Sequence, residues 1–150
     1  MSEFSIQLDW RRTTPDFDTK TFDRSHTWRL AGGQMVQGSS APDYSGDPNR
    51  SNPEEALLAA LSSCHMLTFL TIAALRKLVV DHYEDEPTAE LGKNTKGKMM
   101  VARLTLRPQV VFGGDTIPDA DTVRELHRKA KDNCFVGNSL LSEMVLEPRF

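Results

Sequence analysis

Residues 52–65 read NPEEALLAALSSCH, and this stretch predicts the start of a long, buried helix. Asn52 can cap the helix, Pro53 suits its first position, and Glu55 can close a capping box. Beyond the cap, nearly every residue from 56 to 74 is small or apolar, on all sides of the helix. A helix of this composition is buried on several sides, either centrally in the fold or at a subunit interface.

The chain contains two cysteines, which are its clearest candidates for chemistry. Cys64 falls on an apolar stripe with three- and four-residue spacing, formed by Leu57, Leu61, Leu67 or Thr68, Thr71, Leu75 and Leu78. Cys134 ends a charged helical stretch, 70 residues after Cys64, so any link between the two must be tertiary. One thiolate can attack a substrate, and the other can resolve the product as a disulfide.

The rest of the sequence predicts an α+β fold, with antiparallel hairpins and two main helices against a sheet. We expect a half-buried strand at residues 4–10, strands at 19–30 and 34–38, and a loop at 39–52 before the first helix. After the helix we expect a strand at 79–86, a polar hairpin loop at 85–97, and a long strand at 98–112. A second helix should start at Asp119 or Asp121, and a short strand at 143–148 closes the order βββ–α–ββ–α–β. Because no repeat or linker divides the sequence, residues 1–150 are expected to form one domain.

Composition narrows the functional classes. The chain has 150 residues, a formal net charge of −3 and 39% hydrophobic residues, which describes a globular protein with no general electrostatic attraction to nucleic acid. The first seven residues, MSEFSIQ, lack the basic start of a secretory signal, and polar residues interrupt the apolar region 56–80, so we expect no membrane span. We therefore expect a cytoplasmic protein, and in that compartment two cysteines more often indicate redox or metal chemistry than a permanent disulfide.

Two motifs resemble one known family. Residues 52–65 resemble the first-cysteine motif of the OsmC/Ohr proteins, the osmotically inducible and organic hydroperoxide resistance proteins, and CFVGNS at 134–139 is similar to their second-cysteine motif. Element order and length agree over nearly the whole chain, in the manner of the OsmC-like branch. The resemblance implies an intertwined homodimer with two active sites at the subunit interface. It also implies that organic hydroperoxides, and hydrogen peroxide more weakly, are reduced with no metal or bound organic cofactor, at the expense of a lipoyl-type or thioredoxin-like dithiol.

The resemblance also assigns roles to residues. Cys64 matches the peroxidatic cysteine, Cys134 the resolving cysteine, and Glu54 the glutamate ten residues before the first cysteine. Arg24 is our choice for the catalytic arginine, and Arg50 is the alternative. The chain departs from the family pattern at Phe135, because a proline commonly follows the second cysteine.

The chemistry of a peroxidatic cysteine can also be argued from the residues alone. A free thiol has a pKa of about 8.5, and an apolar helix face raises it, so Cys64 needs a nearby cation to hold its thiolate. An arginine suits this role because it stays charged and donates a planar fork of hydrogen bonds, which a carboxylate such as Glu54 would lock in place. An apolar wall would favour alkyl or fatty-acid peroxides over hydrogen peroxide, and its expected members are Leu57, Leu61, Met66 and Phe69.

The position of Glu54 raises a geometric question. In an unbroken helix, ten residues separate Glu54 from Cys64 by roughly 15 Å along the axis and about 80° around it. Glu54 could not then serve the cysteine of its own helix. Either the helix breaks near residues 59–62, or the glutamate serves the cysteine of a partner subunit.

Other interpretations of the same residues stay open. His65 does not form a dyad with Cys64, because neighbouring helix residues point about 100° apart, and we expect it to be packed or interfacial. A zinc site that uses Cys64, Cys134, His65 and His127 is disfavoured, because no ligand pair has zinc-binding spacing. In place of a peroxidase, the same pocket could belong to a non-enzymatic thiol redox sensor, a small-ligand-binding dimer, or a structural dimer whose cysteines never meet.

Overall fold

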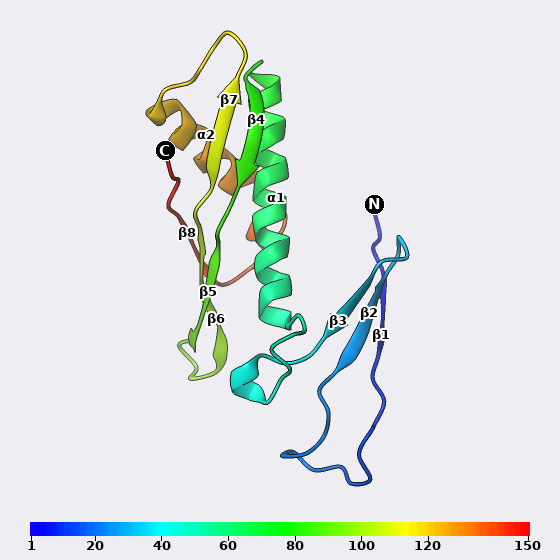
Figure 1. Cartoon of the computed structure of the whole chain (residues 1–150). Coiled ribbons are helices and arrows are strands. Elements are labelled where there is room, and N and C mark those ends of the chain that lie inside the picture. Colours follow the sequence, from blue (N-terminus) through cyan, green and yellow to red (C-terminus); the bar gives the residue numbers. More distant parts are fainter. The chain divides into compact units, whose positions relative to one another are not determined.

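The computed structural model describes all of residues 1–150, and the chain divides into two units, residues 1–56 and 57–150. Figure 1 labels the helices and strands of both units. The first unit contains an antiparallel sheet with the order β1-β2-β3 and a short 3-10 helix, η1. The bounds are Ile6–Asp9 for β1, His26–Leu30 for β2, Met35–Gly38 for β3 and Pro42–Tyr44 for η1.

The strand predicted at 19–30 begins only at His26, so the first part of that prediction is wrong. The side chains of Asp18 and Asp23 each accept a hydrogen bond from the backbone N–H two residues later, both at 2.8 Å. These turns satisfy the backbone without a neighbouring strand. Residues 19–25 are therefore irregular.

The apolar residues at the start of the chain are exposed within one chain, although the sequence predicts a half-buried strand. Phe4, just before β1, is 91% exposed, and Ile6 and Leu8 in β1 are 60% and 66% exposed. A row of exposed apolar side chains is typical of an interaction surface.

Helix α1 spans Pro53–Leu75 without a break, and it begins at the predicted capping box. The side chain of Asn52 accepts a hydrogen bond from the N–H of Glu55 at 2.9 Å, and the carboxylate of Glu55 accepts one from the N–H of Asn52 at 3.3 Å. The helix ends where Lys77 adopts a left-handed conformation, with φ of 59°. Because the helix is continuous, a break near residues 59–62 no longer explains how Glu54 could serve a cysteine.

The buried face of α1 differs from the predicted stripe. Its fully buried residues are Leu61, His65, Phe69 and Ala73, whereas Leu67 and Leu75 are 60% and 79% exposed. A helix that is apolar on all sides carries no periodic signal that selects a face, so periodicity could not identify the buried one.

By length and composition, α1 is long and apolar enough to cross a membrane. The sequence analysis predicts no such span, because polar residues interrupt the apolar region 56–80. Only 22% of its most apolar 18-residue window is buried within the chain. The core helix of a soluble protein meets the same criterion, so the observation is weak evidence for a membrane span.

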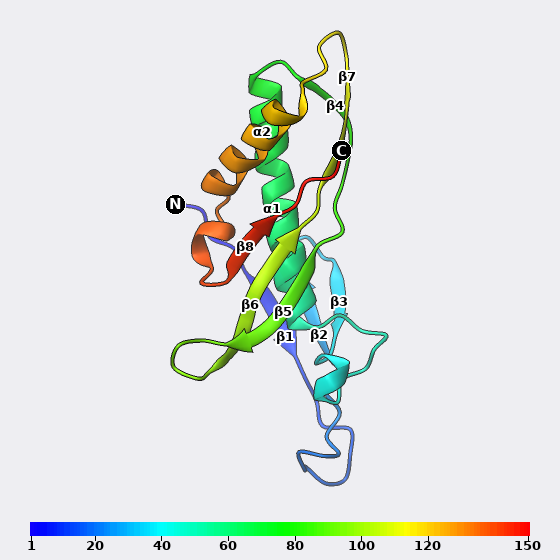
Figure 2. The ribbon, with the colours of Figure 1, turned by 90° about the vertical axis from the view of Figure 1, so that its left-hand side faces the viewer.

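The second unit contains two sheets, which Figure 2 shows from the side of β5, β6 and β8. One sheet pairs β4 with β7 in antiparallel fashion, and the other has the order β5-β6-β8. In the latter, β5 and β6 are antiparallel, but β6 and β8 are parallel. The bounds are Val79–Glu84 for β4, Thr88–Lys93 for β5, Met99–Leu106 for β6, Gln109–Gly113 for β7 and Glu143–Leu146 for β8.

Two predicted elements of this unit need correction. The hairpin loop predicted at 85–97 contains β5, and the turn itself is confined to 94–97. In this turn the side chain of Asn94 accepts hydrogen bonds from the N–H groups of Lys96 and Lys98. The strand predicted at 98–112 is two strands, because Pro108 has no N–H to donate and falls between them. As a result β6 and β7 pair with different neighbours.

Helix α2, Ala120–Asn133, starts at Asp119 as one of the two predicted caps, and a short 3-10 helix, η2, follows at Gly137–Ser139. Both helices pack on the β4–β7 sheet, in a cluster that joins Phe69 and Ala73 of α1 to Leu126 and Ala130 of α2. Figure 2 shows α2 inclined across α1. The predicted α+β class with two helices is thus confirmed, with mixed rather than purely antiparallel sheets and the order βββ–α–ββββ–α–β.

Candidate active site

The second unit brings the two cysteines into direct contact. Cys64 lies midway along α1 and is half-buried, whereas Cys134 follows the last residue of α2 and is fully buried. Cys64 packs against the core cluster that contains Cys134, and the side chain of Cys134 stabilises the Cys64 thiolate. Both cysteines are free, so the tertiary link takes the form of a contact between two reduced thiols.

The turn after α2 places Cys134 opposite α1. The carbonyl of Cys134 accepts a hydrogen bond from the N–H of Asn138 at 2.9 Å, which closes the turn. Inside the turn, the backbone N–H groups of Phe135 and Val136 stabilise the thiolate of Cys64 and so lower the pKa of its thiol. Sequence reasoning missed these donors, because a backbone group carries no residue-type signal.

The two thiols differ in acidity. Burial raises the pKa of Cys64, but the side chain of Cys134, the backbone of the turn and the side chain of Thr68 outweigh this effect, and the net pKa lies below the usual value. Burial also raises the pKa of Cys134, and its hydrogen bond to Cys64 adds to the rise, giving a pKa of about 11. Cys64 is therefore the thiol that ionises first.

Cys64 lies in the wall of an apolar groove of about 810 Å³. The groove is lined by Ala60, Ser63, Cys64, Leu67, Thr68, Thr71, Ile72, Asn133, Phe135 and Val136. None of the four residues predicted for the apolar wall lines it. Leu61 and Phe69 are fully buried in the core instead, because the exposed face of α1 and the turn after α2 form the groove.

Behind Cys64, a pair of histidines joins the two helices. The Nε2 atom of His65 lies 3.0 Å from the Nδ1 atom of His127, and the two rings are nearly parallel with centroids 5.3 Å apart. Burial lowers the pKa of His65 to about 4 and that of His127 to about 3, so both rings are neutral near pH 7. His65 is thus packed, as predicted, but the sequence did not identify His127 as its partner.

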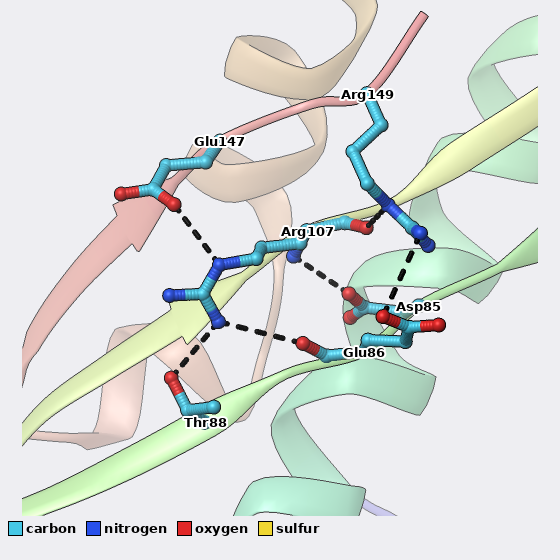
Figure 3. Close-up of polar contacts among 6 residues, drawn as sticks. All are labelled: Asp85, Glu86, Thr88, Arg107, Glu147 and Arg149. Atoms are coloured by element: carbon cyan, nitrogen blue, oxygen red, sulfur yellow. Dashed lines mark hydrogen bonds and ion pairs between the residues drawn. The ribbon is translucent and has the colours of Figure 1, made fainter.

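Asp85 anchors α1 to the strands beneath it. Its carboxylate accepts a hydrogen bond from the Ser62 hydroxyl at 2.6 Å and another from the N–H of Arg107 at 2.6 Å. Figure 3 shows the guanidinium of Arg107 extending to Glu147 and Thr88, while Arg149 donates to the carbonyl of Arg107. This network fixes the junction between β6 and β7 under the helix that carries Cys64.

Arg24 and Glu54 belong to the first unit. The guanidinium of Arg24 donates to the carbonyls of Phe22 and Thr19 at 2.7 and 2.6 Å and stacks on the Phe22 ring at 3.9 Å. It lines an apolar pocket of about 370 Å³ together with Trp10, Phe17 and His26. Arg24 is therefore held in place rather than solvated.

Glu54 and the alternative Arg50 have different surroundings. The Oε2 atom of Glu54 is buried and has no hydrogen-bond partner. Arg50 forms an ion pair with Asp47 at 3.6 Å. Of the predicted site residues, the structure thus brings together the two cysteines, whereas Arg24 and Glu54 share the other unit.

Comparisons with known proteins identify the family of the chain. Residues 46–149 match the OsmC-like protein family, and the chain belongs to this family. A solved OsmC-like protein of unknown function from Vibrio cholerae is 41% identical, with a TM-score of 0.95 over 99% of this chain and 100% of that one.

Two further relatives are more distant. The uncharacterised protein YmaD of Bacillus subtilis is 23% identical over 127 residues, which cover 83% of this chain and 84% of YmaD. The organic hydroperoxide resistance protein OhrB of Bacillus subtilis is 16% identical, with a TM-score of 0.72 over 99% of this chain and 98% of OhrB. At that identity the likeness to OhrB shows a common fold.

Proposed function

We propose that this protein is a thiol-dependent peroxidase that reduces organic hydroperoxides and, more weakly, hydrogen peroxide. The observation that carries the proposal is the contact between two thiols of unequal acidity in the wall of an apolar groove. A common fold with a protein named for organic hydroperoxide resistance supports the same interpretation.

The proposed reaction has two oxidative steps. The Cys64 thiolate attacks the terminal oxygen of the hydroperoxide, an S–O bond forms, the O–O bond breaks, and the alkoxide leaves with a proton as alcohol. The sulfur of Cys134 then attacks the Cys64 sulfenic acid, so that an S–S bond forms and water leaves. An external dithiol reduces this disulfide, becomes a disulfide itself, and returns both cysteines to thiols.

The groove indicates the kind of peroxide. Its walls are apolar around Leu67, Ile72 and Phe135, and it is large enough for an alkyl or aryl chain. Thr68 and the backbone of the turn at Phe135 and Val136 also line the groove, and these polar groups suit the small polar end of a hydroperoxide. We therefore expect alkyl and aryl hydroperoxides to react faster than hydrogen peroxide.

Arg24 and Glu54 complete the proposed site. A guanidinium would stabilise the leaving alkoxide, and the unpaired Oε2 atom of Glu54 is a ready acceptor for such a group. Since α1 is unbroken, Glu54 is about 15 Å along the helix from its own Cys64, which favours service to the cysteine of a second subunit. Arg24 is preferred to Arg50, because Arg24 lines an apolar pocket, whereas Arg50 forms an ion pair with Asp47.

We further propose a cytoplasmic homodimer in which residues 1–150 of each chain act as one domain. The exposed apolar residues of β1 and of α1 are the surfaces that a second copy would cover. The proposed reductant is a dithiol of the lipoyl or thioredoxin type, and the cycle uses neither a metal nor a bound organic cofactor.

The experiment that tests the function is a steady-state assay with cumene hydroperoxide and either dihydrolipoamide or dithiothreitol. Wild type should consume peroxide continuously, and Cys64→Ser should abolish turnover while it preserves the fold, because a hydroxyl is nearly isosteric but far less nucleophilic. Activity of Cys64→Ser within a few-fold of wild type would disprove the role of Cys64.

A non-enzymatic thiol sensor or small-ligand-binding dimer is the alternative function. The groove of about 810 Å³ supports it, because a cavity of that size can hold an intact ligand. This alternative predicts that the cysteines oxidise once without sustained turnover, even with excess dithiol. The steady-state assay separates the two functions.

A further inference from the structure

The buried histidine pair lies between the two elements that carry the cysteines. His65 follows Cys64 in α1, and His127 precedes Cys134 by seven residues, which is about two turns of α2. Their contact is the one buried side-chain hydrogen bond that joins α1 to α2. The other polar link, from Arg76 just after α1 to Glu125, is an ion pair at the surface.

The pair is a costly way to fill the core. Both side chains are at most 1% exposed, and the Nδ1 atom of His65 and the Nε2 atom of His127 have no hydrogen-bond partner. Buried polar atoms without partners destabilise a fold, and two apolar residues of similar shape would pack there at little or no cost. A role in packing alone therefore does not account for the two imidazoles.

A hydrogen bond between two nearly parallel rings is directional, whereas apolar packing is not. The ring planes are 8° apart, and Phe69 stacks on His127 at 4.3 Å, so the pair resists both sliding and rotation of one helix against the other. Disulfide formation depends on such an arrangement, because the Cα atoms must come within roughly 4.4–6.8 Å with a narrow range of torsion angles. A displacement of about 1 Å between the helices is enough to slow such a reaction severely.

We propose that the His65–His127 hydrogen bond is a positioning device that holds α1 and α2 in the register in which Cys134 can attack oxidised Cys64. The inference rests on the proposed two-cysteine cycle. In that cycle the histidine pair would control the rate at which Cys134 closes the disulfide with Cys64. Neither histidine touches the substrate or the reacting sulfurs, so both are positioning residues.

The test compares the rate of disulfide closure in wild type and in the double variant His65→Leu/His127→Leu. Removing both partners avoids an orphaned polar group, so the variant should fold. Closure is followed by mass spectrometry after one equivalent of cumene hydroperoxide and, in a separate arm, after diamide, which oxidises dithiols without peroxidase chemistry. We expect closure about tenfold slower in both arms, the factor that corresponds to one hydrogen bond, with the formation of Cys64 sulfenic acid unchanged.

Two controls make the result specific. His65→Gln/His127→Asn retains hydrogen-bonding groups near the Nε2 and Nδ1 positions and should recover most of the closure rate. Glu125→Gln breaks the surface ion pair between the helices and should leave the rate unchanged.

Equal closure rates in wild type and the double leucine variant would overturn the inference, as would a wild type that closes with neither oxidant. If diamide closure shows the effect but wild type does not consume peroxide, the inference stands and the proposed peroxidase function fails.

Discussion

Cys64 depends on hydrogen-bond donors from the turn after α2 for its acidity. Burial on an apolar helix raises the pKa of a thiol, and at Cys64 the donors of the turn and the Cys134 thiol reverse this effect. One of the donors is the N–H of Phe135, at the position where the family pattern has a proline. Proline has no N–H, so the departure supplies a donor that the common residue cannot.

We therefore predict that Phe135→Pro raises the pKa of Cys64. The extended conformation of Cys134, with φ of −76° and ψ of 115°, is compatible with a following proline, so the turn should survive. The measurement is the pH profile of Cys64 alkylation by iodoacetamide, which should move to higher pH in the variant.

The matched control is Phe135→Ala, which removes the exposed ring but keeps the N–H. Its alkylation profile should follow that of wild type. If the alanine variant shifts as far as the proline variant, the side chain rather than the backbone donor tunes Cys64.

The sequence predicted the residue types of the site better than their surroundings. The spacing of the two motifs and their family resemblance indicated that Cys64 and Cys134 act together, and the structure places them in contact. The donors in the turn, the groove wall and the partnership of His65 with His127 could not be predicted. These three features depend on which face of α1 is buried, and the sequence of a helix that is apolar on all sides does not indicate that face.

Among the elements, predictions held where the local signal was decisive. The capping box at Asn52 and the cap at Asp119 fixed both helix starts. Strand predictions were wrong where side chains competed with the backbone, as Asp18 and Asp23 do before β2, and where tertiary pairing made a strand of the polar segment at 88–93.

The contact between α1 and α2 should be sensitive to acid. In the unfolded chain His65 and His127 bind protons below about pH 6.5, but in the folded chain their pKa values are only about 4 and about 3. Between these values the unfolded state binds more protons, so the free energy of unfolding falls as the pH falls. For His65 alone the loss is on the order of 3 kcal/mol, because a tenfold change in proton affinity corresponds to about 1.36 kcal/mol.

Urea unfolding between pH 7 and pH 4 measures this loss. Wild type should lose stability steadily over this range, and His65→Leu/His127→Leu should lose less, because the remaining titrating groups are common to both proteins. If the free energy of unfolding depends on pH in the same way in both proteins, the histidine pair does not have the lowered pKa values that its burial predicts.

The whole molecule leaves large apolar surfaces uncovered within one chain. They occur in both units, on the first strand and on the outer face of α1. Obligate homodimers bury about 2,000 Å² or more in total, and their interfaces are more hydrophobic than those of transient complexes. We therefore predict that the protein sediments as a dimer at micromolar concentration.

Charge placed on the first strand should weaken that dimer. Phe4→Lys/Ile6→Lys puts two ammonium groups on residues that are exposed in one chain and that our proposal buries in the dimer. Sedimentation velocity should show a shift towards monomer. Leu141→Lys, at an exposed position of the second unit that the proposal does not invoke, is the control and should leave the dimer intact. A wild type that sediments as a monomer would remove the basis for sites shared between subunits.

The unequal burial of the two sulfurs makes recycling directional. In a Cys64–Cys134 disulfide only the Cys64 sulfur faces the groove, so an incoming thiolate must attack there and expel Cys134, which takes up a proton because its pKa is about 11. A dithiol then closes on itself and frees Cys64. A monothiol stays attached to Cys64 and needs a second molecule to enter the same groove. We therefore expect dithiols to recycle the protein faster than monothiols.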